Sequence, residues 1–318
     1  MEFISNCTAD SISNAAKALN DGHLVAFPTE TVYGLGADAT NEKAVSRIYS
    51  VKGRPANHPL IVHISSIIKL EDWASDIPDY AIKLAREFWP GPMTLILPRK
   101  EIAKDFITGG QNNVGLRVPD QPIALALLKK FEELGGQGVA APSANRFGAV
   151  SPTTADAVDE ALGSFFDQND LVLDGGPCQI GLESTIIDCT GAAPIVLRPG
   201  AITKEMIRAV TGNLVGDYEE VVDIRVPGML KNHYSPKAKV VINSEPKTGE
   251  GFIALSNIPT PSGALRLGSI DTTEQFAREI YELLRLGDSK GLSEISVVLP
   301  VEGALIEAIR DRMTKAAG

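Results

Sequence analysis

Apolar and polar positions along the first two thirds of the chain follow two alternating periods. Segments such as SISNAAKALNDG place apolar residues three and four positions apart, which predicts amphipathic helices, whereas short apolar runs such as HLVAF predict buried strands. The expected helices are 11–22, 41–53, 79–89, 121–134, 153–162 and 203–212, and the expected strands are 23–27, 59–64, 93–97, 114–118, 138–144, 171–176, 184–190 and 194–199. This order indicates an α/β layer with a mixed sheet. Asn41 is expected to cap the second helix.

The pattern changes between Gly212 and Ala238. Regular periodicity is lost there, and glycine, proline and polar residues are frequent, as in a linker; long ordered connections are often functional. The residues beyond it predict strands at 239–243, 251–256, 265–269 and 295–300 and helices at 272–287 and 303–317. That order predicts a small, parallel, Rossmann-like α/β domain. We therefore expect a first domain over 1–211, a linker over 212–238 and a C-terminal domain over 239–318.

Composition narrows the class of protein. The chain has 318 residues and a formal net charge of −10 at pH 7, which argues against broad electrostatic wrapping of nucleic acid but permits a local basic pocket for a small anion. No apolar run of membrane-spanning length occurs, and the N-terminus lacks the pattern of a signal peptide, so a cytoplasmic protein is expected. The three cysteines form no CxxC pair and have no neighbouring histidine, which favours reduced, partly buried thiols.

The standard nucleotide-binding motifs are missing from the sequence. It contains no GxxxxGK[ST] phosphate loop and no GxGxxG after the first strand, and we interpret GLGADA at 34–39 as a glycine-containing turn. His58 and His63 are five positions apart, which matches the same face of neither a helix nor a strand, so a pair of metal ligands is disfavoured.

Polar clusters instead follow or end the predicted strands. FPTETVYGLG follows the first strand, and VGLRVP, APSAN, GLESTIID and VLRPG place hydroxyl, amide or guanidinium groups at the ends of others. Each signal is weak alone, because turns and helix starts use the same residues. Together they fit the way in which an open α/β sheet builds a binding crevice from its strand ends.

The stretch KGRPANHPLIVH places Lys52, Arg54, His58 and His63 close together in an acidic chain. Cations just past a helix C-terminus complement the helix dipole, which explains them adequately. The glycine and the proline beside them also stiffen the backbone, as a phosphate cradle with fixed cations requires. Arg117, at alternating spacing in a strand, either faces solvent or can clamp a carboxylate in the cleft.

In this order FPTETVYGLG, KGRP with HPL, VGLRVP, PSAN, GLESTIID and LRPG resemble the threonylcarbamoyl-AMP synthase family, whose catalytic part is the YrdC-like domain. The resemblance covers about residues 8–210, and the linker with its HYSP sequence and the C-terminal domain resemble the longer, two-domain form. The ordered set is specific, whereas no single motif is. It implies a YrdC-like twisted mixed sheet with flanking helices and an open cleft.

The resemblance also implies an activity. Such enzymes combine L-threonine, bicarbonate and ATP, and release threonylcarbamoyl-adenylate and pyrophosphate. The product feeds the N6-threonylcarbamoyladenosine modification of tRNA, so a downstream tRNA threonylcarbamoyl transferase complex is an expected weak or transient partner. Mg²⁺ is expected to arrive with ATP, without a dedicated protein site for the metal, and neither a membrane nor stably bound nucleic acid is expected.

The residues of the site follow from the same resemblance. Lys52 and Arg54 would be catalytic. Threonine and its carbamoyl group would contact Thr31, His63, Arg117, Ala141 and Ser184. ATP would contact Arg54, His58, Asn113, Ser143, Asn145, Ser151, Arg198, His233 and Tyr234, of which the last two belong to the linker and would close over the nucleotide. Asn113 stands where the family usually has threonine; asparagine can still donate and accept. Glu30 could serve magnesium or hold its loop, and the structural role is favoured.

The implied chemistry agrees with these residue types. A carbamate oxygen that attacks the α-phosphorus builds negative charge on the phosphoryl oxygens and on pyrophosphate, which Lys52, Arg54 and Arg198 could stabilise. Two other functions stay open at this point, an RNA-binding module and carbamoyl transfer to another acceptor. The acidic charge and the absence of basic runs with interleaved aromatics disfavour the first. The two-domain layout favours the threonine enzyme over the second.

Overall fold

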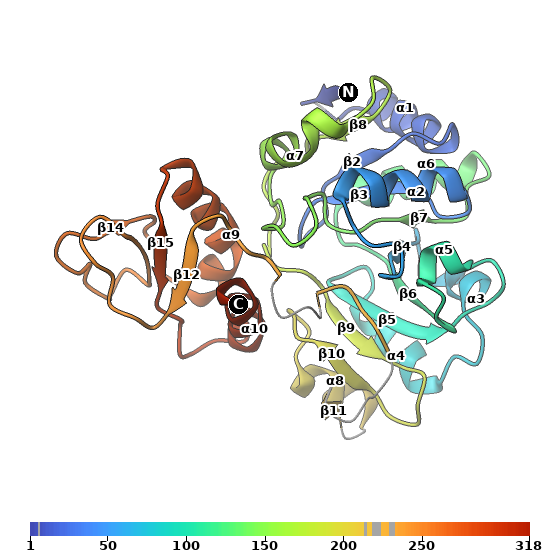
Figure 1. Cartoon of the computed structure of the whole chain (residues 1–318). Coiled ribbons are helices and arrows are strands. Elements are labelled where there is room, and N and C mark those ends of the chain that lie inside the picture. The colour runs from blue at the N-terminus through green and yellow to red at the C-terminus, as the bar shows by residue number, and fades with distance from the viewer. Residues whose placement is uncertain (6, 213–214, 218–223, 229–232) are drawn as a thin grey trace.

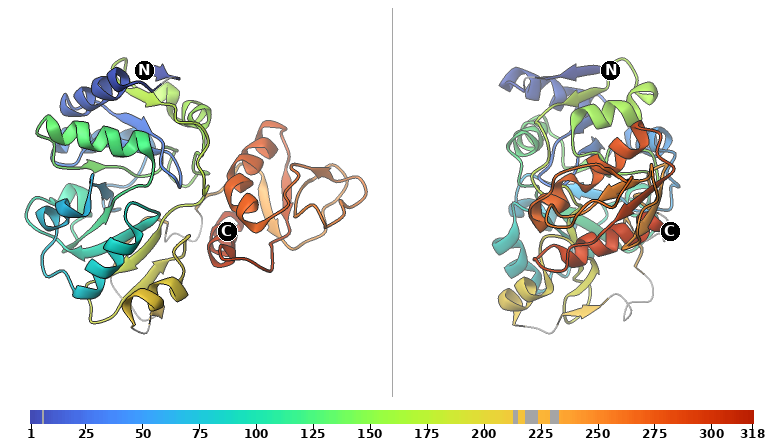
Figure 2. Two further views of the ribbon diagram at one scale, coloured as in Figure 1. Left: turned by 180° about the vertical axis from the view of Figure 1, so that it is seen from behind. Right: turned by 90° about the vertical axis from the view of Figure 1, so that its left-hand side faces the viewer.

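The structure is a computed structural model that describes residues 1–5, 7–212, 215–217, 224–228 and 233–318. A large first domain and a smaller C-terminal domain lie side by side (Figures 1 and 2). Both combine strands with covering helices, as the sequence pattern predicts. Among the helices of the described residues, none combines the length and the apolar character needed to cross a membrane.

The first domain is built on a mixed sheet of 11 strands within the described residues. In sheet order these are β1 (Glu2–Ile4), β8 (Leu171–Leu173), β2 (Val25–Phe27), β3 (Gly34–Asp38), β7 (Val139–Ala140), β4 (Ile61–His63), β6 (Asn113–Arg117), β5 (Met93–Pro98), β9 (Thr185–Asp188), β10 (Ile195–Arg198) and β11 (Gly216–Asp217). Strand β4 runs parallel to β6 and antiparallel to β7. The prediction of a mixed sheet is therefore confirmed.

Helices cover both faces of this sheet. They are α1 (Ala9–Asn20), α2 (Glu42–Lys52), α3 (Leu70–Trp73), α4 (Asp79–Phe88), α5 (Asp105–Thr108), α6 (Pro122–Glu133), α7 (Ala155–Leu162) and α8 (Lys204–Thr211), with short 3₁₀ turns η1 (Ile67–Lys69) and η2 (Gly163–Phe165). Successive residues of a strand point to opposite faces. In β2, Val25 and Phe27 pack with α1 and α6, while Ala26 packs in the larger core with α2.

Local sequence signals set the ends of several helices. Asn41 accepts hydrogen bonds from the amides of Lys43 and Ala44 at 3.1 and 3.2 Å, so it caps α2 as predicted. At the other end of α2, Gly53 takes the left-handed conformation with φ 62°. The chain leaves the helix at this glycine, which lies between Lys52 and Arg54.

One sequence interpretation is wrong. The segment GLGADA is not a glycine-containing turn, because Gly34–Asp38 forms β3, which pairs antiparallel with β2. A Cβ atom on Gly36 would lie 2.9 Å from both the Phe27 ring and Val139 Cγ1. Glycine is needed here because side chains of neighbouring strands fill the space beside the backbone.

The C-terminal domain has a four-stranded sheet in the order β12 (Lys239–Ile242), β15 (Glu294–Val297), β13 (Gly251–Ile253) and β14 (Leu265–Arg266), and every pair is parallel. This confirms the predicted parallel domain. Helices α9 (Thr273–Ser289) and α10 (Ile306–Ala317) lie between this sheet and the first domain (Figures 1 and 2). One apolar cluster joins the two domains, because Val32, Val150 and Leu182 pack with the residues of these helices.

Candidate active site

A cavity lies where strand ends of the large sheet, the loop after β7 and the described part of the linker meet. Most of the residues assigned to a site from the sequence line it. These are Lys52, Arg54, His63, Arg117, Ala141, Ser143, Asn145, Ser184, Arg198, His233 and Tyr234. Residues that are far apart in sequence thus share one site.

Lys52 and Arg54 come from the C-terminal end of α2 and the turn that follows. The Lys52 ammonium donates to the carbonyls of Ser143 and Asn145, at 2.6 Å to the former. Arg54 Nη2 donates to the Pro59 carbonyl at 2.8 Å. Both side chains are buried, at 2 and 7% exposure. Favourable interaction with the helix dipole therefore does not fully explain these cations, because it does not require the two side chains to be buried.

Parallel pairing of β4 with β6 places His63 directly opposite Arg117. Arg117 Nη2 donates to the Thr31 hydroxyl at 2.9 Å and forms an ion pair with Glu30 Oε1 at 2.7 Å. Arg117 therefore points inward and not to solvent, and Glu30 fixes it. Burial and the nearby Arg117 lower the pKa of His63 to about 3, so the imidazole is neutral.

Ser184 and Arg198 lie at the ends of neighbouring strands β9 and β10. Arg198 Nε and Nη2 donate to the Ser184 carbonyl at 3.0 and 2.9 Å, and Nη2 also reaches the Ser184 hydroxyl at 3.1 Å. The hydroxyl of Thr94 lies 2.8 Å from that of Ser184. These bonds fix one wall of the cavity.

His233 and Tyr234 of the linker reach the cavity from the side of the C-terminal domain. Their rings lie edge to face, 4.1 Å apart, and the His233 amide donates to the Lys315 carbonyl at 3.2 Å. Burial, together with Lys52, Arg54 and Arg198, lowers the pKa of His233 to about 3, although Glu183 acts in the opposite direction. The linker thus contributes a neutral imidazole and a phenol.

Four residues assigned from the sequence lie beside the cavity and do not line it. Thr31 is buried behind Arg117. His58 stacks edge-on against Phe147, which itself lines the cavity. Asn113 borders a separate small hollow near Arg225. Ser151 donates to a Glu183 carboxylate oxygen at 2.6 Å.

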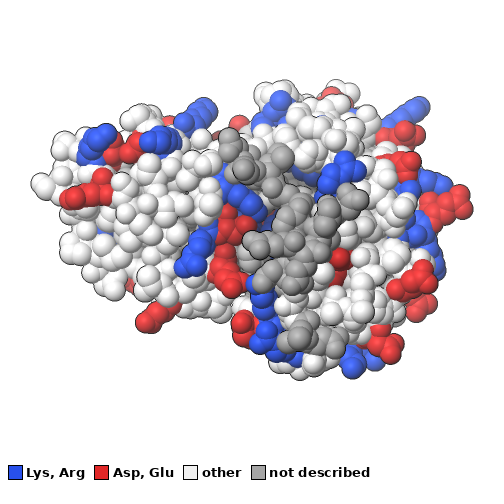
Figure 3. Space-filling view, turned by 60° about the horizontal axis from the view of Figure 1, so that its bottom comes forward, with Lys and Arg blue, Asp and Glu red and all other residues white. Residues whose placement is uncertain are grey.

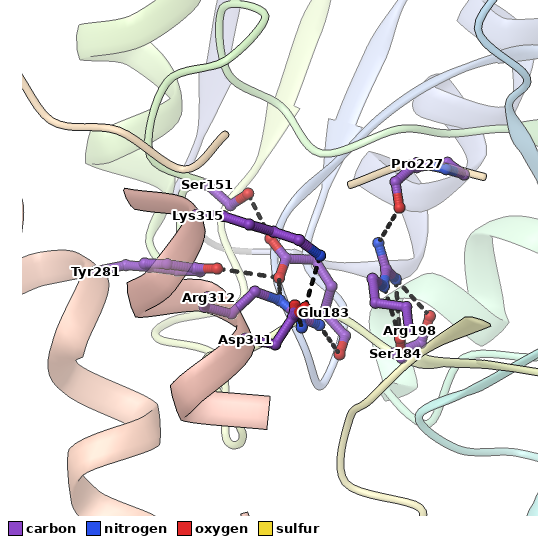
Figure 4. A network of polar contacts seen from close by, with 9 residues as sticks. All are labelled: Ser151, Glu183, Ser184, Arg198, Pro227, Tyr281, Asp311, Arg312 and Lys315. Carbon is purple, nitrogen blue, oxygen red and sulfur yellow. Dashed lines mark hydrogen bonds and ion pairs between the residues drawn. The ribbon is translucent and has the colours of Figure 1, made fainter. Parts of the chain in front are cut away.

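Sequence reasoning missed Glu183, which lines the cavity within GLESTIID. Its carboxylate accepts hydrogen bonds from Ser151, Tyr281 and Arg312 (Figure 4). Burial would raise its pKa, but Arg312 and Arg198 with the Ser151 hydroxyl hold it at about 2. A carboxylate among apolar and hydroxyl-bearing residues indicates a buried cationic partner. The sequence does not identify that partner, because Arg312 lies 129 positions away.

Buried polar atoms without a partner concentrate at this cavity. Within the described part of the chain, the cavity-lining atoms that are buried and lack a hydrogen-bond partner are Arg54 Nε, His63 Nδ1, Arg117 Nε, Asn145 Oδ1, His233 Nδ1 and the Tyr234 hydroxyl. A buried donor or acceptor that stays unpaired costs free energy. A polar ligand would remove that cost by supplying the partners.

The cavity is strongly electropositive. Lys52, Arg54 and Arg198 donate to backbone carbonyls, and none of them pairs with a carboxylate among the described residues, so no bonded anion compensates their charge. Burial first, then Arg54 and Arg146, hold the pKa of Lys52 well below its usual value. Burial also lowers the pKa of Arg54 to about 10, so Arg54 remains a cation at neutral pH. Such an array favours a polyanion.

Family models match nearly the whole chain. The Sua5, YciO and YrdC model, described as telomere recombination, matches residues 17–200, and the model of the threonylcarbamoyl-AMP synthase C-terminal domain matches residues 202–318. The chain belongs to the threonylcarbamoyl-AMP synthase family. It has the two-domain form of that family, so the resemblance noted in the sequence is confirmed.

Individual relatives extend this likeness over the full length. The threonylcarbamoyl-AMP synthase of Pyrococcus abyssi is 41% identical over 323 residues, which cover 96% of this chain and 93% of the relative. The Bacillus subtilis enzyme of the same name is 38% identical with the same coverage. The crystal structure of P. abyssi Sua5 complexed with L-threonine superimposes with a TM-score of 0.88 at 38% identity and covers 99% of this chain and 97% of the other.

Proposed function

We propose that this protein is an L-threonylcarbamoyladenylate synthase, which converts L-threonine, bicarbonate and ATP to threonylcarbamoyl-AMP and pyrophosphate. The observation that carries the proposal is the cavity itself. It combines buried cations whose charge is not neutralised with buried polar atoms that lack partners. These are the properties expected of a site for a nucleoside triphosphate and a small amino acid. Family membership and the threonine-bound structure of the P. abyssi relative support the choice of substrates.

The proposed reaction has two steps. The threonine amine attacks the bicarbonate carbon and water leaves, which gives the carbamate. A carbamate oxygen then attacks the α-phosphorus of ATP, and the bond from that phosphorus to the bridging oxygen breaks, so that pyrophosphate leaves with the electron pair. Negative charge grows on the phosphoryl oxygens and on the leaving group, where fixed cations stabilise it most.

In this proposal Lys52, Arg54 and Arg198 hold the phosphates, because they bring uncompensated charge to one cavity. Arg117 and His63 hold threonine or its carbamoyl group. Arg117 Nε and His63 Nδ1 are both buried and free to donate or accept. Neutral His63 adds no charge beside the bicarbonate.

The remaining assignments rest on position in the cavity wall. Ala141 and Ser184 are placed on the threonine side, and Ser143, Asn145, His233 and Tyr234 on the side of ATP. The other four assigned residues do not line the cavity. In this proposal Thr31 acts through Arg117, His58 through Phe147 and Ser151 through Glu183. Asn113 would contact substrate only after a rearrangement.

Magnesium would enter with ATP and neutralise phosphate charge. The two carboxylates at or beside the cavity, Glu30 and Glu183, are paired with Arg117 and Arg312. Among the described residues no group of three or more His, Cys, Asp or Glu side chains could hold a metal ion. These residues fit a metal ion carried by the triphosphate.

The wider setting also belongs to the proposal. We keep the division into 1–211, 212–238 and 239–318, supported by the end of α8 at Thr211 and the start of β12 at Lys239. A cytoplasmic location and transfer of the product to a tRNA threonylcarbamoyl transferase complex follow from the proposed role. Acidic and basic side chains are interspersed on the face in Figure 3, as expected of an enzyme that does not hold RNA stably.

The proposal is tested by pyrophosphate release from ATP with threonine and bicarbonate each omitted in turn, and by mass spectrometry of the product. We expect release to require both substrates and the product to have the mass of threonylcarbamoyl-AMP. Equal release without threonine would contradict the substrate assignment. Strong, salt-sensitive binding of tRNA without any ATP turnover would support an RNA-binding module instead.

A further inference from the structure

Arg312 connects the C-terminal domain to the wall of the cavity. It lies on α10 and is fully buried. Its Nε donates to Glu183 Oε2 at 2.8 Å and its Nη2 to the Glu183 carbonyl at 3.3 Å, while its guanidinium lies 5.4 Å from the centre of the Tyr234 ring. One side chain of the C-terminal domain thus contacts Glu183 of the GLESTIID segment (Figure 4) and also Tyr234 of the linker.

The contact continues to the residues that line the cavity. Glu183 is fixed on its other sides by the Ser151 hydroxyl at 2.6 Å and by the Tyr281 hydroxyl of α9 at 3.0 Å. The next residue, Ser184, accepts two hydrogen bonds from Arg198 through its carbonyl. A shift of Glu183 would therefore displace Ser184, and with it the guanidinium of Arg198.

Packing in the same place leaves little room for such a shift. Gly181 has φ +80°, and a Cβ atom there would lie 2.4 Å from the Cα of Arg278 in α9. Only glycine permits this close approach of the segment to the helix. Tyr234 also has a positive φ of 62°, which costs free energy for a side chain of its size. Its ring stacks on Tyr281, 5.9 Å away, so the C-terminal domain holds this conformation in place.

Glu183 is poorly suited to a chemical role of its own. Its two oxygens already accept from a guanidinium, a phenol and a hydroxyl, so it has little capacity left to take up a proton or bind a metal. The arrangement has instead the form of a support, in which a buried, fully paired carboxylate fixes the backbone beside a site.

We propose that Arg312, together with Tyr281, is a positioning residue for the nucleotide, which acts through Glu183 on Ser184 and Arg198 and through direct contact on Tyr234. The C-terminal domain then completes the active site without touching substrate. This inference rests on the proposed function for the identity of the nucleotide, but not for the geometry of the contact.

The first test replaces Arg312 by Met in the full chain and uses Arg310→Met as the matched control, since Arg310 is exposed on the same helix. Calorimetry measures binding of a non-hydrolysable ATP analogue, and the pyrophosphate assay gives kcat and KM. We expect Arg312→Met to weaken binding and lower kcat/KM by about tenfold or more, because small displacements of positioned groups are costly. Arg310→Met should stay within about twofold of the unchanged chain.

A second pair keeps the test valid if Arg312→Met does not fold. Tyr281→Phe removes one hydroxyl that holds Glu183. Glu282→Ala removes the neighbouring contact between the domains, to the Thr153 hydroxyl at 2.7 Å. We expect Tyr281→Phe to lower ATP affinity about threefold, which corresponds to the loss of one hydrogen bond to Glu183. Glu282→Ala should lower it less than twofold, because its contact with Thr153 does not involve Glu183. Arg312→Lys should restore part of the affinity.

The outcomes separate the inference from the function. Equal affinity for ATP in folded Arg312→Met and Arg310→Met proteins would overturn the inference, as would equal losses from Tyr281→Phe and Glu282→Ala. An unchanged chain that binds the ATP analogue but releases no threonine-dependent pyrophosphate would overturn the proposed function. In that case the comparison of affinities would still decide the role of Arg312.

Discussion

Lys52, Arg54 and Arg198 share a way of being buried that suits a site for phosphate. Each donates to backbone carbonyls, and within the described part of the chain none of them is bonded to a carboxylate. Arg117 differs, because it is paired with Glu30. The cavity therefore has one part whose cations have no carboxylate partner among the described residues and another part in which Arg117 is paired with Glu30. The uncompensated part suits a triphosphate, and the paired part suits the smaller charge of an amino acid.

Lys52 gives a prediction about protons. Burial and neighbouring cations hold its pKa low in the ligand-free protein, and a bound triphosphate would raise it again. ATP binding should therefore take up a proton at a pH between the pKa of Lys52 in the free protein and its pKa in the complex, and the affinity should fall as the pH rises across that interval. Calorimetry in buffers of different ionisation enthalpy, at a pH where ATP is fully ionised, measures this uptake.

The control for this experiment lies on the same helix. Lys52→Met should abolish the proton uptake and lower turnover on the order of a hundredfold, as loss of one transition-state donor does elsewhere. Lys43→Met, at an exposed position of α2, should change neither. Uptake that persists unchanged in Lys52→Met would mean that another group titrates.

At the scale of elements, the described residues of the linker connect the C-terminal domain to the cavity of the first domain. His233 is bonded to the backbone of α10, and Tyr234 fits against Gly228, where a Cβ atom would lie 2.2 Å from the Tyr234 hydroxyl. Arg198 also donates to the carbonyl of Pro227 at 3.2 Å. The linker therefore contributes to the wall of the cavity, and its sequence composition alone did not reveal that.

We predict that a chain ending at Gly212 loses most or all of its activity while the first domain stays folded. Truncation removes His233 and Tyr234 from the cavity, together with Arg312, which holds Glu183. Among the described residues, truncation takes only the edge strand β11 from the large sheet and only the half-buried Val215 from its two main cores. Circular dichroism and the pyrophosphate assay check the two parts. Full turnover by the truncated, folded protein would make a role of the linker untenable.

At the scale of the whole molecule, an apolar cluster and a buried ion pair join the domains. Glu183 has its pKa lowered to about 2 from the usual 4.5, so the folded state holds fewer protons on this group than the unfolded state between those values. Its stabilising contribution is complete above about pH 4.5 and is lost as the pH falls toward 2. His63 and His233, whose pKa values are lowered to about 3 from 6.5, also make unfolding easier as the pH falls between those values.

A comparison with Glu183→Gln isolates the contribution of this carboxylate to stability. The variant should be less stable at neutral pH, because the buried Arg312 then keeps, of the residues that the structure describes, only the partly exposed Asp311 as a carboxylate partner. The difference in the free energy of unfolding between the two proteins should shrink as the pH falls below about 4.5. Urea titrations at a series of pH values measure it. A difference that stays constant with pH would show that the charge of Glu183 does not hold the domains together.

The sequence by itself determined the class of fold, the two-domain organisation and most residues of the candidate site. Periodicity, caps such as Asn41 and polar strand ends are local, so they can be interpreted without long-range contacts. The same local reasoning predicted a turn at GLGADA, where the structure has a strand. The contacts that require glycine at Gly36 come from Phe27 and Val139 on neighbouring strands, and the segment itself does not contain them.

Only the tertiary structure decided how the buried charges are paired. Sequence motifs contain Glu30, Arg117 and Glu183, but not the distances that join Glu30 to Arg117 and Glu183 to Arg312. Pairing of buried charges depends on which elements pack together, and Arg312 of α10 meets Glu183 where the two domains pack against each other. For this reason the sequence located the site within the first domain and its linker, while the structure assigned part of its support to the C-terminal domain.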